Sequence, residues 1–151
     1  MENCIFCKIV AGEAPSFKIY EDEKYIAILD KYPNTKGQTL VITKEHVDSY
    51  AFDLSDDELC NLINTAKKVA KLLEKGLGVE RVHVVLEGAE ISHLHAKLYP
   101  AIGIAKHEKS VAKGTVSFEK YEGYISTMHG SQASDEELEK LKNMIVEKNK
   151  Q

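Results

Sequence analysis

The stretch HLHAKLYP, residues 93–100, alternates polar and apolar side chains. Side chains alternate across a β-strand, so we expect one face to be polar and the opposite face apolar. The polar row consists of His93, His95 and Lys97, and the apolar row of Leu94, Ala96 and Leu98. Neighbouring polar side chains would stand about 6.6 Å apart, which suits a row that follows a phosphate chain. A half-exposed strand with its polar face toward water would show the same alternation.

Other runs typical of strands precede this one, separated by residues that favour turns. Asp22 and Glu23 separate the first pair of runs, and the Pro-Asn-Thr-Lys-Gly stretch 33–37 separates the second pair. Short runs of this kind joined by turns predict an antiparallel sheet of about five strands. The expected strands cover residues 17–20, 25–30, 39–43, 81–86 and 93–99, and an extra strand or hairpin is expected at 116–128.

Two capping boxes mark helix starts, Ser55 with Glu58 and Ser134 with Glu137. The first opens a long helix, because apolar residues follow at helical spacing until Gly76 and Gly78 end it. Its expected buried stripe is Leu59, Leu62, Ile63, Ala66, Ala70 and Leu73. The second capping box opens a C-terminal helix. With no repeat or linker, the pattern predicts a single α+β domain over residues 1–151.

The bulk composition fits a single hydrophobic core. The chain has 151 residues, of which 43% are hydrophobic and 29% charged, as in ordinary globular proteins. A net charge of −4 argues against binding to duplex nucleic acid, which normally requires a basic face. No apolar run approaches the length of a membrane-spanning helix or a signal peptide. We therefore expect a cytoplasmic protein without a membrane partner.

Two of the three cysteines, Cys4 and Cys7, form a C-x-x-C pair. In a reducing compartment this spacing indicates metal or redox chemistry rather than a disulfide framework. A closed four-coordinate zinc site would need two further ligands. A redox pair is disfavoured, because thioredoxin-like sites follow a strand, whereas this pair lies near the beginning of the sequence. Two unliganded core thiols are the third interpretation.

These segments together resemble the histidine-triad (HIT) family, whose motif is His-x-His-x-His with apolar residues at x. The motif stands here as HLHAKLYP, and the resemblance continues upstream through CIFCKIVAGEAPSFKIYEDEKYIAILD (4–30) and KGQTLVITKEH (36–46). It covers about residues 4–100. It implies a HIT-like fold with a core at 4–100 and a strand/helix extension at 101–151. Relatives of this kind are usually homodimers.

The resemblance also implies a chemistry. His95 takes the place of the nucleophile that attacks the α-phosphate of a nucleotide and forms a covalent nucleotidyl-histidine. Lys97 replaces the third histidine and would stabilise charge on phosphoryl oxygens, although lysine is a poor proton shuttle. The expected activity is a nucleotide hydrolase or nucleotidyl transferase, acting on dinucleoside polyphosphates or phosphoramidates without a catalytic metal. A non-catalytic nucleotide-binding module with a structural zinc is the alternative.

The resemblance further implies the ligand-binding residues. Zinc would be held by Cys4, Cys7, His46 and His93. A purine base would lie among Phe6, Ile9, Ile28 and Leu29, with its ribose on Asp30. Each of these has a plainer interpretation, since the apolar residues could be ordinary core and Asp30 a turn residue. The lysines of residues 106–113 could reach distal phosphates, but a lysine run is usually solvated surface. Glu87 or Glu90 could pair with Lys97.

Overall fold

The computed structural model describes residues 4–105, 107 and 132–150. Among these residues, five strands form one antiparallel sheet in the order β1-β2-β3-β5-β4. The strands are β1 (Lys18–Glu21), β2 (Tyr25–Leu29), β3 (Thr39–Thr43), β4 (Val82–Val85) and β5 (His95–Pro100). The helices are α1 (Ile5–Val10), the short 3₁₀ turn η1 (Ala51–Asp53), α2 (Asp56–Leu77) and α3 (Asp135–Asn149). The α+β class, with one long helix and a C-terminal helix, is confirmed.

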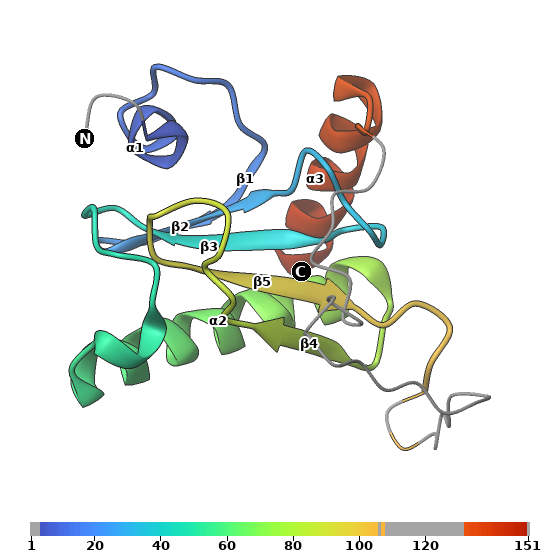
Figure 1. Cartoon of the computed structure of the whole chain (residues 1–151). Coiled ribbons are helices and arrows are strands. Elements are labelled where there is room, and N and C mark those ends of the chain that lie inside the picture. Colours follow the sequence, from blue (N-terminus) through green and yellow to red (C-terminus); the bar gives the residue numbers. More distant parts are fainter. Residues whose placement is uncertain (1–3, 106, 108–131, 151) are drawn as a thin grey trace, which may run out of the picture.

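The helices lie on different sides of the sheet (Figure 1). Helix α2 runs along one face and packs against β3, β4 and β5, and α3 packs beside it against α2 and β1. Helix α1 lies over the opposite face. A long amphipathic helix therefore covers one face of the sheet, and a short helix covers part of the other face.

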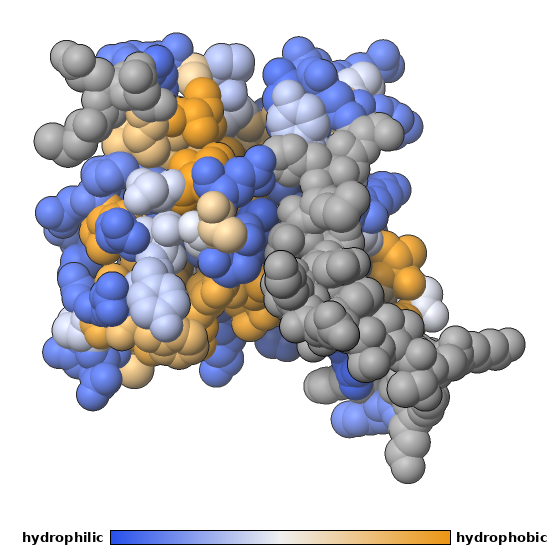
Figure 2. All heavy atoms as spheres, viewed as in Figure 1, coloured by the Kyte–Doolittle hydropathy of each residue, from blue (hydrophilic) through white to orange (hydrophobic). Residues whose placement is uncertain are grey.

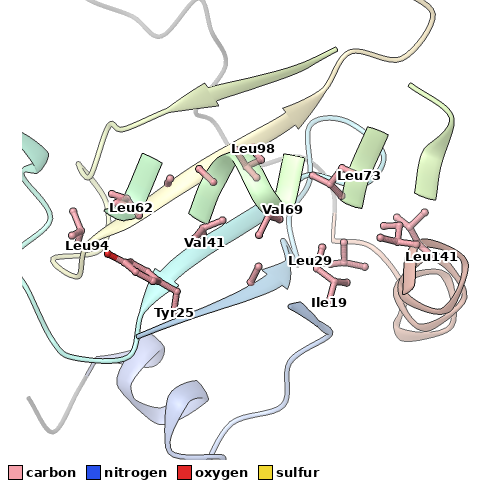
Figure 3. Close-up of a cluster of buried hydrophobic side chains, with 14 of the residues drawn as sticks. Ile19, Tyr25, Leu29, Val41, Leu62, Val69, Leu73, Leu94, Leu98 and Leu141 are labelled. Carbon is pink, nitrogen blue, oxygen red and sulfur yellow. The ribbon is translucent and has the colours of Figure 1, made fainter. Parts of the chain in front are cut away.

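The main core fills the space between the sheet and α2. Alternate residues of the strands, such as Val41 and Leu98, point toward Leu62, Val69 and Leu73 of α2 (Figure 3). All five side chains are at most 1% exposed. Each such apolar side chain contributes roughly 1.5–3 kcal/mol when it is fully buried, so this face of the sheet holds the fold together.

The apolar stripe of α2 is rotated from the one expected. Ile63 is 39% exposed, while Thr65 and Val69 are buried in its place. Gly76 lies inside the helix instead of ending it. A Cβ there would stand 2.6 Å from the Cα of Ile145 in α3, so a glycine lets the two helices approach closely. The close approach of α3, which helical spacing alone does not reveal, sets this part of the core.

Both expected capping boxes are present, and Gly78 ends α2 with a φ of 69°. Strand β3 has the expected bounds, but β5 begins at His95, two residues later than expected. The expected strand at 116–128 lies outside the described residues. Within 4–105, 107 and 132–150, no helix combines the length and apolar composition that crossing a bilayer requires.

Candidate active site and metal centre

His95 stands in the middle of the polar face of the sheet and is 3% exposed. Its Nδ1–H donates a hydrogen bond to the carbonyl oxygen of His93 at 2.7 Å, because a carbonyl can only accept. The other ring nitrogen, Nε2, therefore keeps its lone pair. The ring also packs edge-on against Phe6, with centroids 5.1 Å apart. One contact thus fixes both the tautomer and the orientation of the imidazole.

Burial lowers the pKa of His95, and the charge of Lys97 acts in the same direction. The hydrogen bond to the His93 carbonyl and the charges of Glu87 and Asp30 act to raise this pKa, but they do not outweigh burial. The imidazole is therefore neutral near pH 7. A neutral imidazole with a free nitrogen is a nucleophile or a base rather than an acid.

Lys97 lies beside His95 on the same face and is 6% exposed. Its Nζ forms an ion pair with Oε1 of Glu87 at 2.5 Å. Burial acts to raise the pKa of Glu87, but the hydrogen bond and charge of Lys97, together with the N–H of Ala89, outweigh it and lower this pKa. Of the two carboxylates that could pair with Lys97, Glu87 does so.

A pocket of about 370 Å³ opens between α1 and the sheet, and both His95 and Lys97 line it. In the space-filling view, hydrophobic surface gathers between α1 and the strands beside it (Figure 2). The apolar lining includes Ile5, Phe6, Ile9, Phe17, Ile28 and Leu40. A wider groove of about 900 Å³ beside α2 is lined mainly by charged and amide residues, with no histidine or cysteine among them, so the reactive groups belong to the smaller pocket.

The structure brings the residues expected to bind a nucleotide to this pocket. Phe6, Ile9 and Ile28 line it, whereas Leu29 touches the pocket but belongs to the main core (Figure 3). Asp30 also lines it and is 8% exposed.

The Asp30 carboxylate makes two contacts within the protein. It accepts hydrogen bonds from Nε2 of Gln38 at 2.6 Å and from the backbone N–H of Tyr32 at 2.8 Å. Asp30 is thus both a turn residue and part of the pocket wall. Two hydrogen bonds leave a carboxylate with further lone pairs for a ligand.

A second cluster lies beside His95 and consists of Cys4, Cys7, His46 and His93, whose candidate ligand atoms all lie within 4.8 Å of one another. The His93 Nδ1 stands 3.3 Å from the Cys4 sulfur, 3.6 Å from the Cys7 sulfur and 3.2 Å from the His46 Nδ1. Tetrahedral zinc with ordinary bond lengths separates sulfur from nitrogen by about 3.6 Å and two nitrogens by about 3.3 Å. The four residues therefore fit a tetrahedral ion.

The ring of His93 is oriented by the backbone of β3. Its Nε2–H donates to the carbonyl oxygen of Thr43 at 2.9 Å, which directs Nδ1 toward the cysteines. Such a second hydrogen bond is the usual support of a metal-binding histidine. Because the His93 carbonyl also accepts from His95, one residue connects the cluster to the imidazole in the pocket.

Sequence reasoning missed several supporting residues. Gln38 donates a hydrogen bond to Asp30, and the Thr43 carbonyl accepts one from His93. Both contacts depend on how the strands come together in the sheet, and no local sequence pattern marks either residue. Asp135, at the start of α3, lines the pocket although it is far away in the sequence.

Comparisons with known proteins agree on one family. The HIT domain model matches residues 11–100. An uncharacterised HIT-like protein of Methanocaldococcus jannaschii is 42% identical over 102 residues, which are 64% of this chain and 78% of that protein. The adenosine 5′-monophosphoramidase of Schizosaccharomyces pombe is 38% identical over 91 residues, 60% of this chain and 65% of that enzyme. A hypothetical histidine triad nucleotide-binding protein of Sulfolobus tokodaii superposes with a TM-score of 0.72 at 28% identity, covering 97% of this chain and 92% of that one.

Proposed function

The chain belongs to the HIT family, and we propose that it is a nucleotide hydrolase or nucleotidyl transferase that reacts at an α-phosphate through a covalent nucleotidyl-His95 intermediate. The observation that carries the proposal is the hydrogen bond from His95 Nδ1 to the His93 carbonyl. It leaves Nε2 as the only nucleophilic ring atom, on a side chain that lines an apolar pocket. The relative named as a phosphoramidase supports the same reaction class.

In the first step, the Nε2 lone pair forms a bond to the α-phosphorus. The bond from phosphorus to the leaving group breaks, and its electron pair departs with the leaving group. The Nδ1 proton stays on the hydrogen bond to His93. Lys97, which we propose replaces the third histidine of the motif, stabilises negative charge on the phosphoryl oxygens.

In the second step, an acceptor attacks the phosphorus of the intermediate. The phosphorus–nitrogen bond breaks, its electron pair returns to Nε2, and the acceptor's proton passes to solvent. Water as the acceptor makes the protein a hydrolase, and another nucleophile makes it a transferase. The same residues serve both reactions.

The rest of the pocket would bind the nucleotide. Phe6, Ile9 and Ile28 would enclose a purine base with Leu29 at the edge, because these apolar side chains line the wall beside His95. Asp30 would accept hydrogen bonds from the ribose hydroxyls with the lone pairs that Gln38 and Tyr32 leave free.

The cluster of Cys4, Cys7, His46 and His93 would hold a structural zinc ion. Four protein ligands close the coordination sphere, so the ion would stabilise the fold without contacting substrate. By tying α1 to the start of β5, it would hold Phe6 against His95.

We also propose a homodimer, as is usual for the family. Strand β4 is an edge of the sheet formed by the described residues, and its Val84 is 48% exposed. The exposed edge of a sheet favours pairing with another chain. Size-exclusion chromatography with light scattering tests this, and a monomer at micromolar concentration would contradict it.

The covalent step is tested by trapping it. Wild type, His95→Asn and His83→Asn are incubated with diadenosine tetraphosphate and adenosine 5′-phosphoramidate, quenched in alkaline denaturant, and analysed by intact mass spectrometry. His83 is exposed on β4 and serves as the matched control. We expect nucleotidylated protein for wild type and His83→Asn, and none for His95→Asn. Tight binding without turnover or labelling would favour the non-catalytic binding module.

A further inference from the structure

The ion pair between Lys97 and Glu87 is an unusual feature of the polar face of the sheet. The two side chains are 7% and 15% exposed, and Nζ and Oε1 lie 2.5 Å apart. Lysine is almost never fully buried unless it is paired. The carboxylate therefore offsets the cost of burying the Lys97 ammonium in the pocket wall and restricts its position.

The sheet and the following turn place Glu87 at this point. Val85, the last residue of β4, pairs with Lys97 of β5, and the same antiparallel register extended two residues beyond β4 would put position 87 opposite His95. The backbone then turns at Gly88, which has a φ of +54°, and a Cβ there would stand 2.5 Å from the carbonyl oxygen of Ser49. Only glycine fits this turn, so the path of the chain next to Glu87 is fixed.

The Glu87 carboxylate has a polar neighbour at each of its oxygens. Oε1 faces the Nζ of Lys97, and Oε2 accepts a long hydrogen bond of 3.4 Å from the backbone N–H of Ala89. A carboxylate with two partners has little freedom to follow a substrate. The ammonium that it holds therefore stays beside His95 as a fixed positive charge.

A fixed positive charge assists some leaving groups and not others. When His95 attacks a phosphoanhydride, the phosphorus–oxygen bond breaks and the bridging oxygen departs as an anion, which needs a nearby cation and no proton. When His95 attacks a phosphoramidate, the phosphorus–nitrogen bond breaks and the departing nitrogen must receive a proton. A lysine bound to a carboxylate is a poor donor of that proton, because loss of the proton would leave the carboxylate without its partner.

We propose that Glu87 is a positioning residue that holds the ammonium of Lys97 in place beside His95, and that this pair makes the site selective for phosphoanhydrides over phosphoramidates. The proposal rests on the covalent reaction proposed above. It narrows the substrate class to phosphoanhydrides, whose leaving group is itself a phosphate or polyphosphate.

The wild-type protein provides the first test. We compare kcat/KM for diadenosine tetraphosphate and adenosine 5′-phosphoramidate, and in parallel for the two guanosine analogues. We expect the anhydrides to be preferred by about 10²-fold or more, the usual contribution of general acid catalysis that an amine leaving group would lack. Equal efficiency, or a preference for the amidates, would overturn the proposal.

Three variants test the role of the pair. Glu87→Gln is expected to reduce kcat for the anhydrides about tenfold with an unchanged or lower KM, because the freed ammonium binds ground-state phosphate but is no longer held in place. Glu87→Asp keeps the carboxylate and is expected to recover part of kcat. Lys97→His introduces a proton shuttle and is expected to raise the amidate-to-anhydride ratio.

Glu74→Gln is the matched control, because it breaks the exposed Lys71–Glu74 ion pair on α2. It should leave the substrate ratio and kcat unchanged. Circular dichroism establishes that each variant is folded. If Glu87→Gln does not fold, the wild-type ratio of kcat/KM for the anhydride to that for the amidate still decides the proposal. Covalent labelling of His95 without the anhydride preference would overturn this inference and leave the proposed function intact. Turnover without any labelling of His95 would overturn both.

Discussion

The two sides of the segment 94–98, most of which is strand β5, have opposite character although both are buried. Leu94, Ala96 and Leu98 are at most 2% exposed and pack toward α2 within the main core. His95 and Lys97 are 3% and 6% exposed and face the pocket beneath α1. The apolar row interacts with any well-shaped apolar neighbour, whereas each member of the polar row needs one particular partner.

Within this short segment, one row of side chains contributes to stability and the other contains the candidate reactive groups. Buried polar groups cost free energy unless they are hydrogen-bonded or paired. His95 donates to the His93 carbonyl, and Lys97 pairs with Glu87. Buried polar groups at positions where apolar side chains would fold as well are typical of functional sites. Each row can be perturbed without the other.

The largest expected effect is on the polar row. His95→Asn should reduce turnover by at least about 10³-fold, because it removes the nucleophile on which a covalent path depends. The affinity for nucleotide, measured by isothermal titration calorimetry, should change far less, since the apolar wall remains. Turnover that persists at the wild-type rate in this variant would remove the distinction between the two faces.

The apolar row should show the reverse behaviour. Leu98→Ala should reduce the free energy of unfolding by about 2–5 kcal/mol, because it leaves a cavity against α2. Urea unfolding measures the loss, and kcat per folded molecule should stay close to that of wild type. Ile63→Ala, at a 39% exposed position of α2, is the control and should cost much less. A large loss of kcat in folded Leu98→Ala would mean that the two faces are coupled.

Metal removal should destabilise the polar side without disturbing the main core. Cys4→Ser and Cys7→Ser should reduce bound zinc, measured by elemental mass spectrometry, and lower the melting temperature by about 4–8 °C, equivalent to roughly 2 kcal/mol. Treating wild type with a chelator should reproduce this shift, and added zinc should reverse it. A protein purified without zinc and insensitive to chelator would show that the cluster is not a metal site.

The smallest expected effect concerns the pH dependence of the Glu87–Lys97 pair. The pKa of Glu87 is lowered from its ordinary value of 4.5, so its contribution to stability is complete above that value and is lost as pH falls through the lowered pKa. Wild type should exceed Glu87→Gln by about 1–2 kcal/mol in unfolding free energy near neutral pH, with the difference shrinking in acid. Glu74→Gln, in an exposed pair, should differ little from wild type at any pH. A difference that is independent of pH would show that the ion pair is not its cause.

The sequence predicts much of the fold because its signals there are local. Ser55 and Glu58 form the expected capping box, and Thr39–Thr43 is the expected strand. The phase of α2 is not local, since its packing against the sheet and α3 determines which side is buried. Spacing alone therefore placed Ile63 in the core, where it is not.

The candidate site was predictable in part for the same reason. The alternation within HLHAKLYP indicates a polar row, and the C-x-x-C pair indicates half of a metal cluster. The choice of Glu87 over Glu90 as the partner of Lys97 follows from the register between β4 and β5, which the sequence does not specify. The hydrogen bond from Gln38 to Asp30 depends likewise on the turn between β2 and β3.

The most direct test of the account concerns a single atom. Wild-type protein is reacted with an excess of a slowly turned-over dinucleoside polyphosphate, denatured in alkali and digested, and the labelled peptide is analysed by mass spectrometry and phosphorus NMR. Because Nδ1 of His95 is held on the His93 carbonyl, we predict a phosphorus–nitrogen bond at Nε2 of His95. Attachment at Nδ1 or at another residue, or steady turnover with no covalent species, would contradict the account.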